Sequence, residues 1–309
     1  MALDVSVDLC GISLRNPLVL ASGIWGSCAE TLVRVGRAGA GAVTAKSCSL
    51  EPRQGHPNPT VLDWGHGLIN AIGLSNPGAW EEKRILQRAA VGLKEMGVPL
   101  IASVFAETIV SFQRTVEIIA QAEPDLIELN ISCPNVEDEF GRPFALDPIM
   151  AAKVTAAVRE VYKGILSVKL SPNVPDIVQV ARAVEKAGAD LLTAVNTLGP
   201  GMVIDVHAGR PVLSNKVGGI SGAALRPIAV RCVYEITQAV SIPVIGMGGV
   251  LTGEDAMQML MAGATAVGIG SALYYYGEAA FMRILGELEE LMVQEGYSSI
   301  KEFRGCAHG

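Results

Sequence analysis

The segment LNISCPN, residues 129–135, places an asparagine and a cysteine where an apolar run ends. Asn130 carries both hydrogen-bond donors and acceptors, and Cys133 follows it by three residues. A thiol beside a bound ligand can act as a base or a nucleophile once it has lost its proton. A structural cysteine near a turn is the alternative interpretation, and the segment alone leaves both open.

Other apolar segments also end in polar side chains. These side chains belong to Ser22, Lys46, Ser47, Ser103, Lys169 and Asn196. A single lysine at the end of an apolar segment can simply extend to solvent. Two lysines and two asparagines that converge on one place would each need a buried partner, so together they indicate a site for a polar ligand.

Three glycine clusters predict a phosphate site. They are GGISG (218–222), Gly248 with Gly249, and Gly270 with Ser271. Glycine lets a ligand approach the backbone, and the N–H groups at a helix start can hold a phosphate, although ordinary tight turns are the alternative. The run GMGGVL has a leucine where a dinucleotide fingerprint needs its third glycine. A mononucleotide such as FMN is therefore the expected ligand.

An FMN site would give both lysines a role. A fixed cation stabilises the negative charge that a reduced flavin carries near N1 and O2, and Lys169 is the candidate for that cation. Lys46 can do similar work or hold an anionic substrate. Asn70, Asn130 and Asn196 suit a ring with carbonyl and N–H edges, although each of them could instead form a turn.

The elements that must position these residues alternate between strand and helix. The predicted strands cover residues 17–23, 42–47, 99–105, 125–132, 166–171, 190–196, 243–249 and 266–272. Helical patterns between them cover residues 79–96, 111–122, 148–162, 176–187, 223–239 and 254–262. Strands that are apolar nearly throughout indicate a parallel sheet covered by helices on both faces.

Such a pattern over 309 residues predicts an α/β fold, a (β/α)8 TIM barrel that forms one domain over residues 1–309. A doubly wound open sheet is the alternative. Two insertions, 48–78 and 197–222, are rich in Gly, Pro, Asn and His and would extend the loops at the carboxyl end of the barrel, where TIM barrels build active sites. Glycines after three predicted helices, in KEMGVP, EKAGAD and LMAGAT, indicate where those helices end.

The composition excludes several classes of protein. A net charge of −7 argues against a nucleic-acid footprint, and no apolar run reaches the roughly 18 to 20 residues that a membrane span needs. The six cysteines are scattered without a CxxC pair and the four histidines lack HxxxH spacing. We therefore expect reduced thiols, no metal site and a cytoplasmic protein.

The motifs together resemble the FMN-containing catalytic subunit of class 1 dihydroorotate dehydrogenases over essentially the whole chain. They are NPLVLASG, AKSCSLEPRQGHPNP, NAIGLSNPG, NISCPN, VKLSPN, NTLGPGMVID, GGISG, IPVIGMGG and GIGSAL. LEPR, NTLGPGMVID and IGMGG resemble the 1B subtype more than the fumarate-reducing 1A subtype. That resemblance implies oxidation of dihydroorotate to orotate, with electrons passed to NAD⁺ through a separate subunit that carries FAD and a [2Fe–2S] cluster. It also implies a homodimer that recruits two such subunits into a heterotetramer.

The resemblance assigns roles to residues at matching positions. It implies that Cys133 is the catalytic base and that Lys46 reaches both ligands. The implied flavin contacts are Ser22, Lys46, Ser47, Ser103, Asn130, Lys169, Val195, Gly222, Gly248, Gly249, Gly270 and Ser271. The implied orotate contacts are Lys46, Asn70, Ala71, Ile72, Gly73, Leu74, Asn130, Asn196 and Thr197.

The chain also departs from the family pattern. Ser103 stands where the family usually has an asparagine against the flavin, and His56 replaces the asparagine of GNP. Residues 136–148 are more acidic than the usual glycine-rich loop. The alternatives left open are a fumarate-using 1A enzyme, a flavoenzyme like dihydropyrimidine dehydrogenase, and a non-catalytic phosphate-binding barrel or assembly scaffold.

Overall fold

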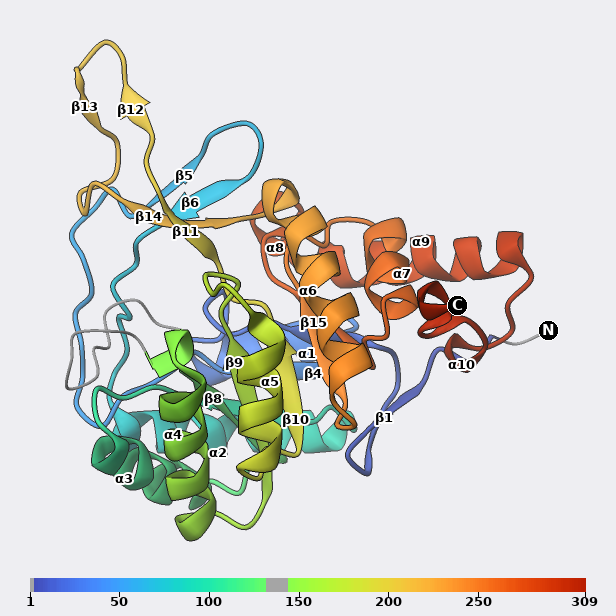
Figure 1. The fold of residues 1–309 in the computed structure, drawn as a ribbon, viewed down its shortest axis with the longest axis horizontal. Coiled ribbons are helices and arrows are strands. Elements are labelled where there is room, and N and C mark those ends of the chain that lie inside the picture. Colours follow the sequence, from blue (N-terminus) through green and yellow to red (C-terminus); the bar gives the residue numbers. More distant parts are fainter. Residues whose placement is uncertain (1–2, 132–143) are drawn as a thin grey trace.

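A closed barrel of eight parallel strands forms the centre of the molecule. The computed structural model describes residues 3–131 and 144–309 (Figure 1). Around the barrel each strand pairs with the next one of the set, and the last pairs with the first. The strands are β3 (Leu18–Leu20), β4 (Ala42–Thr44), β7 (Leu100–Val104), β8 (Leu126–Asn130), β9 (Ile165–Leu170), β10 (Leu191–Ala194), β15 (Val244–Met247) and β16 (Ala266–Ile269). The predicted TIM barrel is confirmed, and the open sheet is excluded because β16 pairs with β3.

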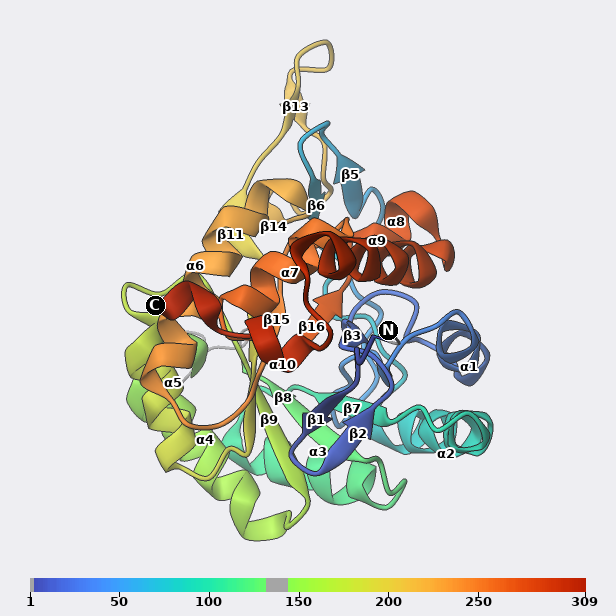
Figure 2. The same ribbon diagram turned by 90° about the vertical axis from the view of Figure 1, so that its right-hand side faces the viewer.

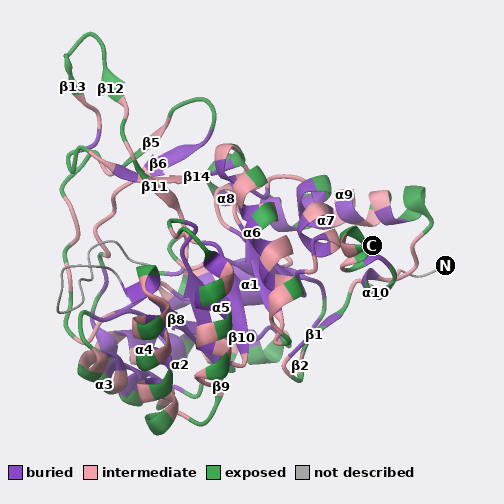
Figure 3. Cartoon of the chain, viewed as in Figure 1, coloured by how far each residue is buried: buried purple, intermediate pink, exposed green. Residues whose placement is uncertain are grey.

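The burial of these strands explains why apolar runs predict them. Every residue of β7 and β8 is buried, because one face of each strand points into the barrel and the other packs under helices. Figure 3 shows the buried strands inside and the exposed faces of the helices outside. Most of the strands are shorter than the runs that predict them, although β9 is as long as its run. The polar residues Ser22, Ser47 and Asn196 follow the ends of β3, β4 and β10 at the mouth of the barrel, whereas Asn130 and Lys169 lie within β8 and β9.

Helices surround the barrel (Figure 2). They are α1 (Ala29–Arg37), α2 (Ala79–Glu95), α3 (Ile109–Ala120), α4 (Pro148–Val161), α5 (Ile177–Lys186), α6 (Arg226–Ala239), α7 (Gly253–Met261), α8 (Ala272–Tyr276), α9 (Ala279–Glu295) and α10 (Ile300–Phe303). Gly97, Gly188 and Gly263 have positive φ after α2, α5 and α7, which confirms the three predicted helix ends. No helix in the described parts of the chain is long and apolar enough to cross a membrane.

A short hairpin at the amino end of the chain lies at the opposite end of the barrel from the mouth. It consists of β1 (Val7–Leu9) and β2 (Ile12–Leu14), which pair antiparallel. The Sγ of Cys10, in the turn, donates to the carbonyl of Asp190 just before β10 begins, at 3.3 Å. Leu9 and Leu14 are buried, so the hairpin covers the amino end of the core.

The two insertions pair with each other, which the sequence analysis missed. They contain β5 (Val61–Asp63), β6 (Leu68–Asn70), β11 (Leu198–Gly201) and β14 (Gly218–Ser221), which form one sheet in the order β11-β14-β6-β5. A second hairpin, β12 (Ile204–Asp205) with β13 (Arg210–Pro211), projects from this sheet as an arm (Figure 1). The insertions are therefore an ordered cover beside the mouth, where the sequence predicted only extended loops.

Candidate active site

Polar side chains gather inside the barrel at the carboxyl ends of its strands. Lys169, in β9, donates from Nζ to the Oγ of Ser22, which follows β3, at 3.3 Å. Strands β9 and β3 stand on opposite sides of the barrel, four strands apart in either direction. The lysine side chain therefore crosses the mouth, as a residue aimed at a central ligand must.

The environment of this lysine suits an anionic ligand. Lys169 is 4% exposed, and no carboxylate of the described residues lies within 4.0 Å of its ammonium. The neutral hydroxyl of Ser22 is the hydrogen-bond partner that the structure gives it. A buried cation is costly unless it meets an opposite charge, so the position favours a ligand that carries or develops negative charge.

A hydrogen-bonded row connects strands β8, β4 and β7. The Nδ2 of Asn130 donates to the Oγ of Ser47 at 3.2 Å, and the hydroxyls of Ser47 and Ser103 lie 2.8 Å apart. Ser103 in turn donates to the Oε1 of Glu128 at 3.0 Å. Sequence analysis selected the first three residues and missed Glu128. The sequence feature that could have indicated Glu128 is an acidic residue within the apolar run of residues 125–132.

Two asparagines from the ends of β8 and β10, the strands on either side of β9, also meet. The Nδ2 of Asn196 donates to the Oδ1 of Asn130 at 3.4 Å, and the Oδ1 of Asn196 accepts the backbone N–H of Thr197 at 2.9 Å. Val195, the residue before Asn196, is buried, and its backbone N–H donates to the carbonyl of Met247 in β15 at 2.9 Å. Both amides are thus held on two sides, which gives a ligand a fixed set of donors and acceptors.

The insertion sheet brings further predicted substrate contacts to the same mouth. The Nδ2 of Asn70, at the end of β6, donates to the carbonyl of Gly219 in β14 at 3.4 Å. A side chain at Gly219 would collide with Thr197, because a Cβ there would lie 2.3 Å from the hydroxyl of Thr197. Asn70 and Thr197, one from each insertion, therefore both contact Gly219. Asn70 is the last residue of the strand β6.

The segment from Ala71 to Leu74 is held by His56, an earlier residue of the same insertion. The backbone N–H of His56 donates to the carbonyl of Ile72 at 3.0 Å, and its Nδ1 lies 3.1 Å from the carbonyl of Ala71. Gly73 packs against His56, since a Cβ on Gly73 would lie 2.6 Å from the backbone nitrogen of His56. His56, a departure from the family pattern, thus has a structural role in fixing this segment.

The predicted phosphate rim has the chemistry of an anion site. A Cβ on Gly249 would lie 2.4 Å from the carbonyl oxygen of Gly222, so the two glycine clusters touch. Among the described residues, the backbone N–H groups of Gly248, Gly249, Gly270 and Ser271 have no hydrogen-bond acceptor. Donors gathered on one rim without acceptors fit the oxygens of a phosphate.

An ion pair lies next to this rim, since its Arg226 packs against Gly249. Arg226, at the start of α6, pairs with Asp255 in the first turn of α7, and the carboxylate also accepts the N–H groups of Leu251 and Thr252. Thr252 and Asp255 form a reciprocal capping box at the start of α7. The backbone that follows Gly249 is therefore fixed before any ligand binds.

Two predicted residues remain, Lys46 and Cys133. Lys46 leaves β4 with its backbone N–H donated to the carbonyl of Gly26 at 2.9 Å, and its side chain is half-buried. Cys133 lies outside the described residues, as do its neighbours from 132 to 143. Within the described ranges, no group of three or more His, Cys, Asp or Glu side chains could hold a metal ion.

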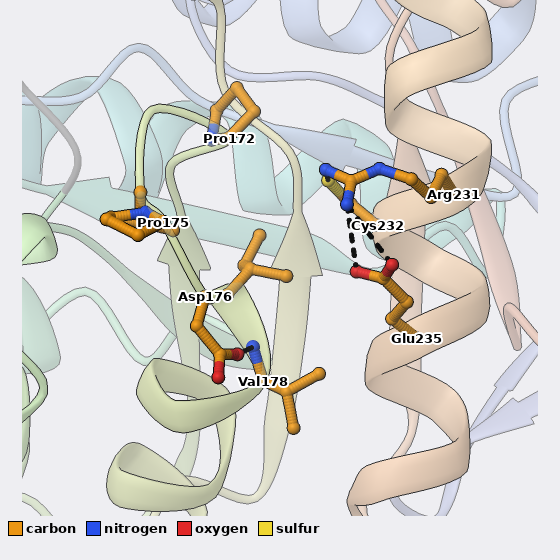
Figure 4. A pocket seen from close by; sticks show the side chains of 9 residues that line it. Pro172, Pro175, Asp176, Val178, Arg231, Cys232 and Glu235 are labelled. Carbon is orange, nitrogen blue, oxygen red and sulfur yellow. Dashed lines mark hydrogen bonds and ion pairs between the residues drawn. The ribbon is translucent and has the colours of Figure 1, made fainter.

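A separate cavity of about 430 Å³ lies between the loop before α5 and the helix α6 (Figure 4). Its charged groups already have partners in the protein. Arg231 pairs with Glu235 at 3.1 Å, and Asp176 accepts the N–H of Val178 at 2.9 Å as the N-cap of α5. It contains none of the predicted site residues, so the mouth of the barrel is the candidate active site.

Comparison with known proteins agrees with this geometry. Residues 4–292 match the family described as dihydroorotate dehydrogenase. The chain is 45% identical over 304 residues to the protein named dihydroorotate dehydrogenase B (NAD(+)), catalytic subunit, of Methanothermobacter thermautotrophicus, covering 98% of each chain. Proteins with the same name are 44% identical in Bacillus pumilus, over 97% of this chain and 96% of that one, and 42% identical in Pyrococcus abyssi, over 98% and 99%.

Proposed function

The chain belongs to the dihydroorotate dehydrogenase family, and we propose that it oxidises dihydroorotate to orotate in pyrimidine biosynthesis as the catalytic subunit of an NAD⁺-linked enzyme. The observation that carries the proposal is Lys169, a buried cation that spans the mouth beside the hydrogen-bonded pair Asn130 and Asn196. A scaffold protein has no need of a buried charge at this place. The family resemblance inferred from the motifs is confirmed.

The residues at the mouth fit FMN. The backbone donors of Gly248, Gly249, Gly270 and Ser271, with Gly222 beside them, would hold its phosphate. Residues at the strand ends would hold its ring system, and these residues are Ser22, Lys46, Ser47, Ser103, Asn130, Lys169 and Val195. When bound, FMN supplies the acceptor for the hydride that leaves C6 of dihydroorotate. Lys169 then places a positive charge where negative charge develops.

The substrate would lie between the barrel and the insertion sheet. Asn130, Asn196 and Asn70 present amides that suit the carbonyl and N–H edges of the pyrimidine ring, and Thr197 adds a hydroxyl. Lys46 is the cation proposed for the carboxylate of orotate. The segment from Ala71 to Leu74 would cover the ring, since its backbone is anchored to His56.

The proton at C5 needs a base on the side of the ring opposite the hydride acceptor. We propose Cys133, which follows Asn130 by three residues in the chain. Asn130 ends β8 at the mouth, and the proposal requires the thiol three residues later in the chain to reach the substrate ring from there. An unperturbed thiol has a pKa of about 8.5, which leaves a few per cent thiolate at pH 7.

Electrons must then leave the site for NAD⁺. The relatives are named as catalytic subunits of an NAD⁺ enzyme, which supports a partner subunit for this chain. We propose that the partner carries FAD and a [2Fe–2S] cluster and that two copies of each subunit form a heterotetramer. The cysteines of this chain are scattered and do not form the clustered set that such an iron–sulfur centre requires.

Anaerobic titration of the purified chain, reconstituted with FMN, tests the proposal. Dihydroorotate should bleach the flavin absorbance near 450 nm, and orotate should be the product. Dihydrouracil, which lacks the carboxylate, serves as the matched control and should reduce the flavin far more slowly. A folded chain that takes up no FMN, or one that dihydrouracil reduces as fast as dihydroorotate, would contradict the proposed function.

A further inference from the structure

The carboxylate of Glu128 is buried inside the barrel without a role in the proposed mechanism. Glu128 is 2% exposed and stands in β8, two residues before Asn130, so both side chains point to the same face of the strand. The hydroxyl of Ser103 donates to its Oε1 at 3.0 Å. Burying a carboxylate is costly, and a residue with this cost calls for an explanation.

The hydrogen bonds of polar groups buried inside the barrel can be completed without a charged group. Ser167, the register partner of Glu128 in β9, lies in the same layer and bonds to the hydroxyl of Thr193 at 3.0 Å. Both of these hydroxyls are fully buried, and two neutral groups satisfy each other. A carboxylate differs from a hydroxyl in one respect that matters here, because it only accepts hydrogen bonds.

An acceptor at the end of the row gives the whole row a direction. A hydroxyl has one hydrogen, and that of Ser103 goes to Glu128, so Ser47 must donate across the 2.8 Å contact to Ser103. The hydrogen of Ser47 is then committed, and its oxygen accepts from the Nδ2 of Asn130 at 3.2 Å. The Oδ1 of Asn130 consequently faces Asn196, whose Nδ2 donates to it at 3.4 Å.

We propose that Glu128 is a positioning residue that fixes the side-chain amide of Asn130 for substrate. Through Ser103 and Ser47 its carboxylate fixes the acceptor that meets the Nδ2 of that amide, while Asn196 holds the Oδ1 side in the same orientation. Removing Glu128 takes away one of these two constraints, and a site that is correctly oriented for a smaller part of the time binds with proportionately lower affinity. The inference rests on the proposed function, because it assumes that Asn130 recognises orotate.

The substitution Glu128→Gln tests this inference, because it keeps the size of the side chain and adds a donor that can reverse the row. With FMN at full occupancy, we expect the Kd for orotate and the KM for dihydroorotate to rise about three- to tenfold. The rate of flavin reduction at saturating dihydroorotate should change less than the KM. Ser103→Ala should produce a similar loss of orotate affinity, since it interrupts the same row.

A double-mutant cycle separates action through Ser103 from a general structural effect. The double variant Glu128→Gln, Ser103→Ala should bind orotate about as weakly as the weaker single variant. Thr193→Val is the matched control, because it removes a buried hydrogen bond in the same layer outside the row. It should lower the melting temperature and leave the orotate Kd unchanged.

Three outcomes would overturn the inference: an unchanged orotate Kd in Glu128→Gln, losses that multiply in the double variant, or an equal loss in Thr193→Val. If Glu128→Gln does not fold, Glu128→Asp takes its place, and wild-type orotate affinity there would also overturn it. Failure of the proposed function would be distinct, because the wild-type chain itself would then neither bind orotate nor be reduced by dihydroorotate.

Discussion

At the scale of single residues, the candidate site depends on charged and titratable groups that are buried from solvent. Lys169 is the clearest case, because it is buried and the described residues place no carboxylate within 4.0 Å of it. An interaction that strengthens only as charge develops lowers the barrier more than it tightens binding. The role of this lysine can therefore be tested by separating rate from affinity.

We expect Lys169→Ala to slow flavin reduction by dihydroorotate by about 10²-fold or more, a loss typical of removing one preorganised stabilising group. The affinity for FMN should fall less. Lys153→Ala, an exposed lysine on α4, is the control and should leave both unchanged. Stopped-flow absorbance with saturating FMN measures the rate, and a wild-type rate in Lys169→Ala would remove the lysine from the mechanism.

The proposed base makes a prediction of its own. Cys133→Ala should slow flavin reduction by about 10²–10⁴-fold while orotate still binds, because general-base catalysis typically contributes this much. Cys133→Ser keeps an oxygen at similar reach but with a far less acidic proton. That variant should be slow at neutral pH and recover as the pH rises, whereas the wild type should level off above the pKa of its thiol.

A structural cysteine would behave differently. Both substitutions would then change the melting temperature and leave the reduction rate and its pH profile close to those of the wild type. Stopped-flow measurements across pH in all three proteins distinguish the two cases. Wild-type reduction in Cys133→Ala would end the proposal.

Sequence predicts the residues of this site better than the contacts between them. Lys169, Asn130 and Ser103 are visible because each ends an apolar run. Glu128 is not, since one acid in a strand could equally point to solvent at the sheet edge. Its partner Ser103 becomes informative only when β7 and β8 are in register, with Ser103 opposite Glu128.

At the scale of elements, the barrel strands and main helices follow from pattern, but the insertion sheet does not. The strand β11 has the sequence LGPG and β14 has GGIS, and each is only four residues long. Glycine and proline are depleted in strands, so local propensity opposes this pairing. The sheet forms because β14 pairs with β6 from the other insertion, which is a contact between distant segments.

Helix α2 contains a second buried carboxyl that sequence does not reveal. Glu82, in its first turn, is 1% exposed, and neither carboxyl oxygen has a hydrogen-bond partner in the described structure. Burial raises the pKa of Glu82 to about 8, the charge of Glu81 adds to the rise, and Lys46 opposes it. The folded protein therefore holds a proton that the unfolded chain, with an ordinary pKa near 4.5, releases.

This difference in pKa makes the stability of the protein depend on pH. The free energy of unfolding should fall as the pH rises from about 4.5 to about 8, because the native state binds more protons in that window. Glu82→Leu should remove this dependence and stabilise the protein more at pH 8 than at pH 5. The extra gain is on the order of 1.4 kcal/mol for each pKa unit of the shift.

Chemical denaturation of both proteins at several pH values measures the effect. Glu95→Leu, an exposed position near the end of the same helix, is the matched control and should leave the pH dependence as it is. Parallel curves for wild type and Glu82→Leu between pH 5 and pH 8 would show that Glu82 is ionised in the folded protein.

At the scale of the whole molecule, the barrel brings one end of every strand to a common mouth. Closure requires β16 to pair with β3, which joins residues about 250 positions apart, so no local pattern encodes it. The sequence indicates the number and order of the strands. Right-handed crossovers between successive parallel strands, which are the rule in such folds, then place each strand beside the next. Single polar residues scattered over the chain thus become one site.

The same architecture limits what this chain can do alone. The motifs predict a mononucleotide site at the mouth, and the sequence contains no dinucleotide fingerprint for NAD⁺. We therefore expect the isolated chain, loaded with FMN, to be bleached by dihydroorotate without help and to remain bleached when NAD⁺ is added without oxygen. Ferricyanide, which needs no docking site, is the control acceptor and should restore the colour at once.

A partner subunit should change only the second half of this reaction. Copurification with tagged chain should recover a protein that contains FAD and iron, and adding it should let NAD⁺ restore the flavin colour with formation of NADH. The rate of bleaching by dihydroorotate should stay within about twofold, since the partner is not needed for the chemistry at C5 and C6. Rapid NADH formation by the rigorously purified single chain would contradict the two-subunit arrangement and leave the proposed oxidation of dihydroorotate intact.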